Sequence, residues 1–292
     1  MDTYRKTLNQ IIDGIEPLDA GWFEKARQRT GRLVMPNRAL GRLHDIAERL
    51  CAIRQTTKPD LAPTAVVVMA GDHGVASDGV SAYPQEVTGE MIKTFIKGGA
   101  GINVMARHVG AEIRVVDMGV IPEIDPQQLD AADQLLIRKI AKGTANLSRG
   151  PAMTRMDAET AVLTGFGVAA DLFDEGIQML GTGDMGIGNT TASAAIGTVV
   201  TGCSLKEMVG RGTGVDDQGV QRKLVVIQRA IEINRPDRTD GLDILSKIGG
   251  FEIGGIAGCI LAGAYYKRPV VIDGFISTAG ALIANILSPL ST

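Results

Sequence analysis

The 292-residue sequence is poor in aromatic residues, histidine and cysteine. Aromatic residues make up 4% of the chain, with a single Trp, and there are three His and three Cys. Cys51, Cys203 and Cys259 lie far apart and lack the spacing of a metal site or a disulfide framework. We therefore expect free, mainly buried thiols in a reducing compartment, and the cysteines give no indication of a metal ion.

The sequence also lacks a strong charge of either sign and a long apolar run. The net charge is −3 and the basic residues are scattered, which disfavours a nucleic-acid partner or an anionic membrane surface. The longest apolar run, residues 253–266, is interrupted by glycine and is too short to cross a bilayer. Residues 1–10 do not resemble a secretory signal. These observations predict a cytoplasmic protein that binds neither membrane nor nucleic acid.

Glycine, by contrast, is abundant, with 37 residues. The stretch GTGDMGIGNTTASAAI, residues 181–196, reads as a strand, a tight turn and the start of a helix. Gly183, Gly186 and Gly188 would let a ligand approach the backbone, and the free N–H groups of the helix would bind phosphate. The pattern matches neither GxxxxGK[ST] nor GxGxxG, which disfavours an ordinary triphosphate or dinucleotide site.

Two threonines and a lysine would add to this anion site. Thr190 and Thr191 could cap the helix and donate hydroxyl hydrogens to phosphate. Lys223 is the last residue of GRGTGVDDQGVQRK, residues 210–223, which begins with a glycine turn. It is expected near a helix start, where a cation is unfavourable unless an anion lies close by. A purely structural turn and a solvated lysine remain open alternatives.

Apolar runs near residues 65, 112, 177 and 269 alternate with helical patterns. This order predicts an α/β fold, a parallel sheet with helices on both faces (Rossmann-like, doubly wound). Amphipathic helices near the N-terminus predict a small helical domain over residues 1–55, followed by the α/β domain over 56–292. The polar segment 122–155 is expected to face the site or an interface.

Polar side chains follow the strand AVVVMA at residues 65–70. Asp72, His73, Ser77 and Gln85 lie in the loop GDHGVASDGVSAYPQEVT, where α/β proteins commonly bind ligands. A hydrogen-bonded turn is the alternative interpretation for Asp72 and His73.

Six stretches together carry a family resemblance: GDHGVASDGVSAYPQEVT, GGAGINVMA, GTGDMGIGNTTASAA, GRGTGVDDQGVQRK, GGFEIGGIAG and PVVIDGFISTAGALIA. In this order they resemble the nicotinate-nucleotide:5,6-dimethylbenzimidazole phosphoribosyltransferase family, over roughly residues 30–287. The resemblance implies a glycosyltransferase of cobalamin biosynthesis. It would act as a homodimer, without metal or cofactor, and would transfer phosphoribose from nicotinate mononucleotide to a benzimidazole base, giving α-ribazole 5′-phosphate and nicotinate.

The resemblance also assigns site residues. Gly186, Ile187, Gly188, Asn189, Thr190 and Thr191 would bind the 5′-phosphate with help from Lys223. Ser77 and Gln85 would line the benzimidazole pocket. Asp184 stands where many relatives have glutamate and would stabilise positive charge on the ribose.

One departure from the family pattern concerns the general base. Relatives assign that role to a glutamate in a later GEGTGA-like motif, which is absent from this sequence; Asp184 and Glu252 are the acids in motif positions that could partly replace it. The alternative to the transferase is therefore a catalytically impaired or shortened form that binds nucleotide or base, or that pairs with a longer subunit.

Overall fold

The computed structural model describes residues 6–36, 38–126, 129 and 131–292. Its centre is a parallel sheet with the strand order β3-β2-β1-β4-β5. The strands are β1 (Thr64–Gly71), β2 (Ala111–Gly119), β3 (Leu135–Ile137), β4 (Met179–Met185) and β5 (Val270–Val271). This sheet confirms the predicted α/β fold. The short strand β3 lies inside the segment read as a polar loop, and its three residues are too few to give a strand pattern.

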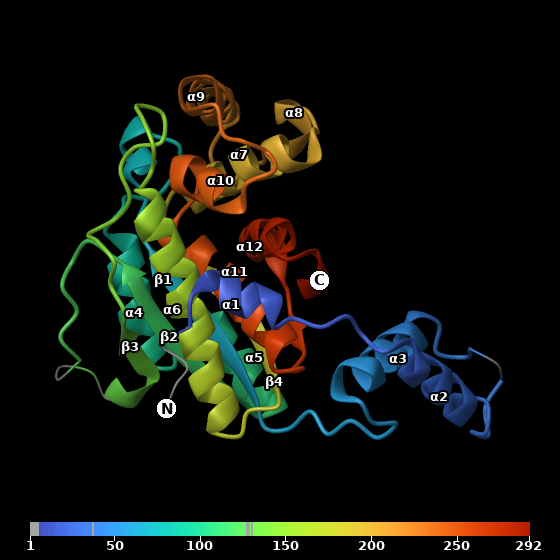
Figure 1. Ribbon diagram of the computed structural model, residues 1–292. Helices are drawn as coiled ribbons and strands as arrows, with labels where there is room; N and C mark the ends of the chain where they lie inside the picture. Colours follow the sequence, from blue (N-terminus) through green and yellow to red (C-terminus); the bar gives the residue numbers. More distant parts are fainter. Residues whose placement is uncertain (1–5, 37, 127–128, 130) are drawn as a thin grey trace.

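Helices cover both faces of the sheet, because alternate residues of β1 face opposite layers. Val68 and Ala70 pack with the apolar residues of α4 (Val87–Ile96) and α5 (Gly101–Val109). Val67 and Met69 belong to the larger core on the other face, with α6 (Arg155–Asp174) and α11 (Phe251–Tyr265). In Figure 1, α6 runs along the front of the sheet.

The tightest helix packing joins α11 to α6. A Cβ at Gly258 would lie 2.0 Å from the carbonyl oxygen of Val162, and one at Gly254 would lie 2.7 Å from Cβ of Ala161. The small residues of α11 therefore allow this close helix contact. This contact fixes the start of α11 against the sheet, where the candidate site lies.

The remaining helices lie beside and above α11 in Figure 1, with α8 and α9 at the top and α12 next to α11. They are α7 (Asn189–Thr201), α8 (Leu205–Met208), α9 (Asp217–Asn234), α10 (Gly241–Ile248) and α12 (Gly274–Leu287). Short 3-10 turns are found at Gly74–Asp78, Ala132–Gln134 and Pro289–Ser291. None of the helices among the described residues is long and apolar enough to span a bilayer.

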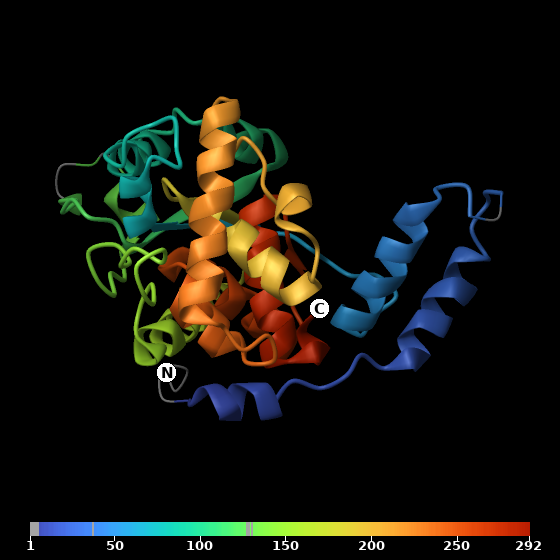
Figure 2. The same ribbon diagram turned by 90° about the horizontal axis from the view of Figure 1, so that it is seen from above.

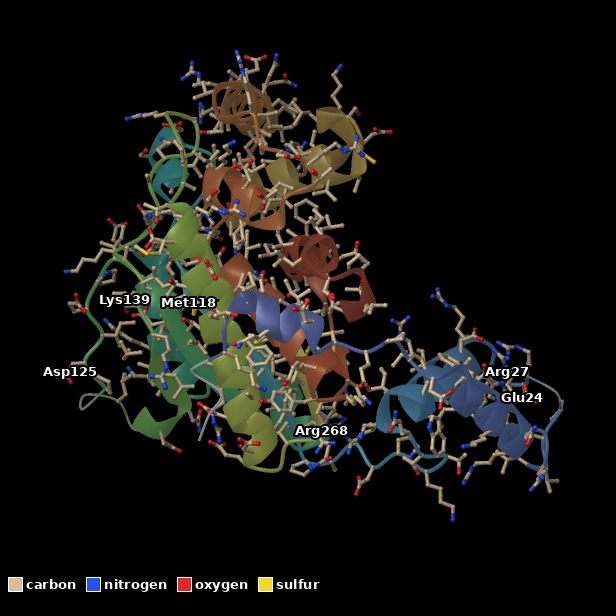
Figure 3. All side chains as sticks on the ribbon, in the orientation of Figure 1. Glu24, Arg27, Met118, Asp125, Lys139 and Arg268 are labelled. Atoms are coloured by element: carbon tan, nitrogen blue, oxygen red, sulfur yellow. The ribbon has the colours of Figure 1, made fainter. Side chains whose placement is uncertain are left out.

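The N-terminal helices differ in what they contact. α1 (Leu8–Asp13) packs on the main core through Leu8 and Ile11. α2 (Ala20–Thr30) and α3 (Arg42–Arg54) pair with each other and extend away from the sheet in both ribbon views (Figure 2). Arg27 and Glu24 mark this hairpin in Figure 3. A domain boundary at residue 55 stays a prediction.

Candidate active site

The carboxyl ends of β1 and β4 lie side by side in the middle of the sheet. The strands pair in parallel, with Met69 opposite Asp184 and Ala70 opposite Met185. The strand order reverses at β1, and open α/β sheets bind ligands outside the carboxyl ends at such a point. The loop after β1 and the turn after β4 therefore meet at one edge of the sheet, as the sequence predicts.

The glycines after β4 bring two parts of the protein together. A Cβ at Gly186 would lie 2.3 Å from the carbonyl oxygen of Gly71, and Gly188 has a φ of +98°. Helix α7 begins at Asn189, with Gly188 as its N-cap and no side-chain hydrogen bond there. The predicted capping by Thr190 or Thr191 is wrong, because both residues already lie in the first turn.

Part of the backbone of this turn is engaged within the protein. The N–H groups of Ile187, Asn189 and Thr191 already donate to oxygen atoms of the protein. Ile187 is 3% exposed and Thr191 is fully buried. An anion at this place would be held by the hydroxyl of Thr190 and by Lys223, which meet there, together with the other N–H groups of the turn.

Lys223 is almost completely buried, with 1% of its surface exposed. Its Nζ donates to Oγ1 of Thr190 at 2.8 Å. Gly212 adjoins both groups, since a Cβ there would lie 2.8 Å from each of the two atoms. Burial lowers the pKa of Lys223 to about 8, because the charged form loses its hydration.

Two sequence expectations about Lys223 need correction. Helix α9 begins at Asp217, so Lys223 lies in its second turn, beyond the short range of the helix-dipole effect. The alternative of a solvated lysine is wrong as well. None of the salt bridges formed by the described residues includes Lys223. A buried cation without a carboxylate partner is suited to an anionic ligand.

Asp184 is the next-to-last residue of β4, beside this turn. Its Oδ2 accepts a hydrogen bond from Nδ2 of Asn189 at 2.9 Å. Burial, together with the negative charge of Glu252, raises the pKa of Asp184 to about 6, although Asn189 and His73 oppose the shift. The carboxyl group therefore titrates near neutral pH and would be stabilised as an anion by a bound cation.

A fully buried pair, His73 and Glu252, lies next to Asp184. Nε2 of His73 and Oε1 of Glu252 are 2.6 Å apart, and neither side chain is exposed. Burial acts to lower the pKa of His73, but the neighbouring carboxylates, Glu252 foremost, outweigh it and raise this pKa. Asp72 is buried too and accepts from the backbone N–H of Ile121 at 2.8 Å.

The pairing of His73 with Glu252 was not foreseen from the sequence. The residues are 179 positions apart, and the available signal was the glycines around Glu252. A Cβ at Gly250 would lie 2.3 Å from Cε1 of His73. Because Glu252 is enclosed with His73, its position does not support the sequence expectation that it could act as a substitute base.

Ser77 and Gln85 lie in the loop after β1. Oγ of Ser77 donates to the carbonyl of Gly74 at 2.8 Å, and Nε2 of Gln85 donates to the carbonyl of His73 at 3.1 Å. Segment 146–149 packs on this loop through hydrogen bonds to Asp78. Part of the polar segment 122–155 therefore faces the loop that holds Ser77, as expected.

Asp117, at the end of β2, is occupied by structural contacts. Its Oδ1 accepts from the N–H groups of Gly119 and Val120, and Nζ of Lys139 lies 3.3 Å from Oδ2. Lys139 appears beside Met118 of β2 in Figure 3. These contacts fix the turn after β2. The carboxylates near β1 and β4 are therefore better candidates than Asp117 for a role in chemistry at this edge of the sheet.

Comparison with known proteins identifies the family. A family model described as phosphoribosyltransferase matches residues 15–292. A nicotinate-nucleotide–dimethylbenzimidazole phosphoribosyltransferase of Geotalea uraniireducens is 48% identical over 282 residues, which cover 97% of this chain and 79% of that protein. The chain belongs to this phosphoribosyltransferase family.

Further members agree with this assignment. The enzyme of the same name from Roseiflexus sp. is 50% identical over 97% of this chain and 78% of its own length. The crystal structure of CobT from Thermus thermophilus has a TM-score of 0.86 and 44% identity, covering 92% of this chain and 79% of that one. About a fifth of each of these relatives lies outside the match.

Proposed function

We propose that this member of the family transfers the phosphoribosyl group of nicotinate mononucleotide to 5,6-dimethylbenzimidazole or a related base. The products are α-ribazole 5′-phosphate and nicotinate, and the reaction belongs to cobalamin biosynthesis. The family assignment supports the reaction, and one structural observation carries its location. The buried Lys223, which forms no salt bridge with the residues that the structure describes, meets Thr190 at the edge of the sheet where Asp184 also lies.

The site residues divide into three roles in this proposal. Lys223 and Thr190 bind the 5′-phosphate, with the turn 186–191 shaping the site. Asp184 faces the ribose, where its negative charge stabilises the positive charge that develops at the anomeric carbon. Ser77 and Gln85 contact the benzimidazole.

The chemistry needs two faces of the ribose. Nicotinate leaves as a neutral pyridine ring from a ribosyl pyridinium, so its departure requires no general acid. The benzimidazole nitrogen attacks the opposite face, which inverts the anomeric centre, and its N–H proton must pass to a base. The family pattern assigns this base to the glutamate of the GEGTGA-like motif, which this sequence lacks, so in this chain the proton passes to solvent and the transfer is expected to be slow.

Chromatographic detection of products tests the reaction. The 292-residue chain, given both substrates, is expected to release nicotinate and α-ribazole 5′-phosphate in equal amounts, and omission of either substrate is expected to abolish both. If this chain binds both substrates but forms no product, while a longer relative forms product under the same conditions, the alternative of a binding protein would be favoured.

Two further features belong to the proposal. We infer a homodimer, which the exposed apolar side chains Val104, Met105 and Val109 of α5 support. Sedimentation that shows only monomer at high micromolar concentration would contradict it.

We also infer a cytoplasmic location, supported by the three free cysteines, Cys51, Cys203 and Cys259.

A further inference from the structure

Hydroxyl groups tie together two loops that the proposed function assigns to different substrates. Oγ1 of Thr213 accepts a hydrogen bond from the backbone N–H of Ala82 at 2.9 Å and lies 3.0 Å from Oγ of Ser81. Oγ of Ser81 also accepts from the N–H of Tyr83 at 3.2 Å, which closes the turn on that side. Ser81 and Thr213 are 132 positions apart in the chain. The contact therefore joins two segments that the sequence does not bring together.

One of these segments, residues 210–216, adjoins the proposed phosphate site. A Cβ at Gly212 would lie 2.8 Å from both Nζ of Lys223 and Oγ1 of Thr190, and the carbonyl oxygen of Gly210 lies 3.5 Å from the same Nζ. The backbone of Gly212 therefore forms one wall of the place where Lys223 and Thr190 meet. Because Thr213 is the next residue, any movement of Thr213 shifts that wall.

The other segment belongs to the loop of the benzimidazole. Ser81 and Ala82 lie midway between Ser77 and Gln85, which the proposed function places against the base. Ser77 and Gln85 are each bonded to a carbonyl at the start of this loop. Residues 82–84 between them are exposed, so their position depends on the contact with Thr213.

A second contact joins the same two sides. Nη1 of Arg222 donates to the carbonyl oxygen of Gly79 at 3.0 Å. Gly79 has a φ of +69°, and a Cβ there would lie 3.2 Å from this nitrogen. Arg222 directly precedes Lys223 in α9, so the turn of α9 that carries Lys223 into the phosphate site also reaches the loop of the base.

We propose that Thr213 is a positioning residue for both substrates. Through Ser81 and Ala82 it fixes the loop that contacts the benzimidazole, and through Gly212 it fixes the wall of the phosphate site. A loop that is held in place before binding costs less to order when a ligand arrives, so this contact strengthens the binding of each substrate. The inference rests on the proposed function for the identity of the two substrates, whereas the link between the loops does not depend on any ligand.

Calorimetry with each substrate alone tests the proposal, because no transfer takes place without the second substrate. Thr213→Val keeps the shape of the side chain but removes the hydroxyl, and Thr213→Ser keeps the hydroxyl. Ser81→Ala removes the partner on the other loop. Thr160→Val in α6 loses a hydroxyl hydrogen bond to Met156 within its own helix and is the matched control.

The decisive result is an effect on both substrates. Thr213→Val is expected to raise the Kd of dimethylbenzimidazole and the Kd of nicotinate mononucleotide about threefold to tenfold each, the range for a lost hydrogen bond. Ser81→Ala is expected to raise the Kd of the nucleotide about threefold, and its combination with Thr213→Val raises that Kd no further, because both changes act on one contact. Thr213→Ser and the control bind as the wild type does.

An effect of Thr213→Val that is confined to one substrate overturns the proposal, and so does full additivity of the two substitutions. If Thr213→Val fails to fold, the Kd of the nucleotide in Ser81→Ala decides the question, because Ser81 lies on the side of the base. An unchanged Kd in that variant refutes the positioning role.

Hydrogen exchange of the ligand-free protein is the second readout. The N–H groups of Tyr83 and Val215 donate to oxygen atoms of their own loops, so neither loses its acceptor directly in Thr213→Val. Both are expected to exchange about threefold to tenfold faster in this variant and at the wild-type rate in Thr213→Ser. Unchanged exchange in a protein that catalyses transfer would refute the positioning role alone. Faster exchange in both loops, with neither substrate bound nor transferred by any of the proteins, would refute the proposed function alone.

Discussion

Replacement of Lys223 by methionine is expected to make the free protein more stable and the nucleotide complex weaker. Methionine fills a similar volume without a charge. Burial lowers the pKa of Lys223 from 10.5 to about 8, a difference worth about 3 kcal/mol. The charged lysine therefore destabilises the folded state at pH 7, and this cost disappears as the pH rises from about 8 to 10.5.

The gain in folding stability is smaller than the full cost of the buried charge, because Lys223→Met also loses the 2.8 Å hydrogen bond to Thr190. Urea unfolding at pH 7 should show an increase in stability of about 1–3 kcal/mol. Calorimetry should show binding of nicotinate mononucleotide weakened by about 1.5–3 kcal/mol, the range for a charge-assisted hydrogen bond. Lys93→Met, at the surface of α4, is the control and should change neither. Unchanged affinity, or a loss of stability, would refute the assignment of Lys223 to the anion site.

Three further predictions follow from the same edge of the sheet. Asp184→Asn should stabilise the protein at pH 8 by up to about 3 kcal/mol and have no such effect below pH 3.8, because the raised pKa of about 6 makes ionisation costly as the pH rises through that value. The same variant should transfer phosphoribose more slowly. The same difference in stability between variant and wild type at both pH values would contradict a buried charge at Asp184. Gly186→Ala should lose about 1–3 kcal/mol of stability in urea unfolding, since its Cβ would clash with the protein backbone; Gly210→Ala, with open space around it, is the control, and equal effects would contradict the close contact. Gln85→Ala should raise the KM for dimethylbenzimidazole about fivefold to tenfold while the KM for nicotinate mononucleotide stays constant; a rise confined to the nucleotide would place Gln85 elsewhere.

Much of the fold was predictable because it depends on local patterns. The run AVVVMA is apolar at every position, which predicts a strand covered on both faces, and β1 is such a strand. β3 was missed because three residues, Leu135–Ile137, are too few to show a period. The N-cap of α7 is Gly188 and not Thr190 or Thr191, as the sequence predicted, because threonine is a good N-cap in general, while Gly188 meets the required positive φ here.

The candidate site was less predictable, because its key contacts join distant segments. The importance of residues 181–196 and 71–88 was apparent from their glycines and polar residues. The burial of Lys223 was not, since the dipole argument assumed a position at a helix start. The pairing of His73 with Glu252 depends on how α11 packs against α6 and the sheet, and a single sequence has no signal for such a long-range contact.

The most direct test of the central claim follows the anomeric carbon of the nucleotide. Nicotinate mononucleotide labelled with ¹³C at C1′ is incubated with the chain and dimethylbenzimidazole, and the label is followed by NMR. The proposed function predicts that the label moves into a single α-configured N-glycoside of the benzimidazole, in proportion to the nicotinate released, and that Asp184→Asn slows this movement. Appearance of the label in ribose 5-phosphate, or in a β-configured product, would contradict an inverting transfer to the base.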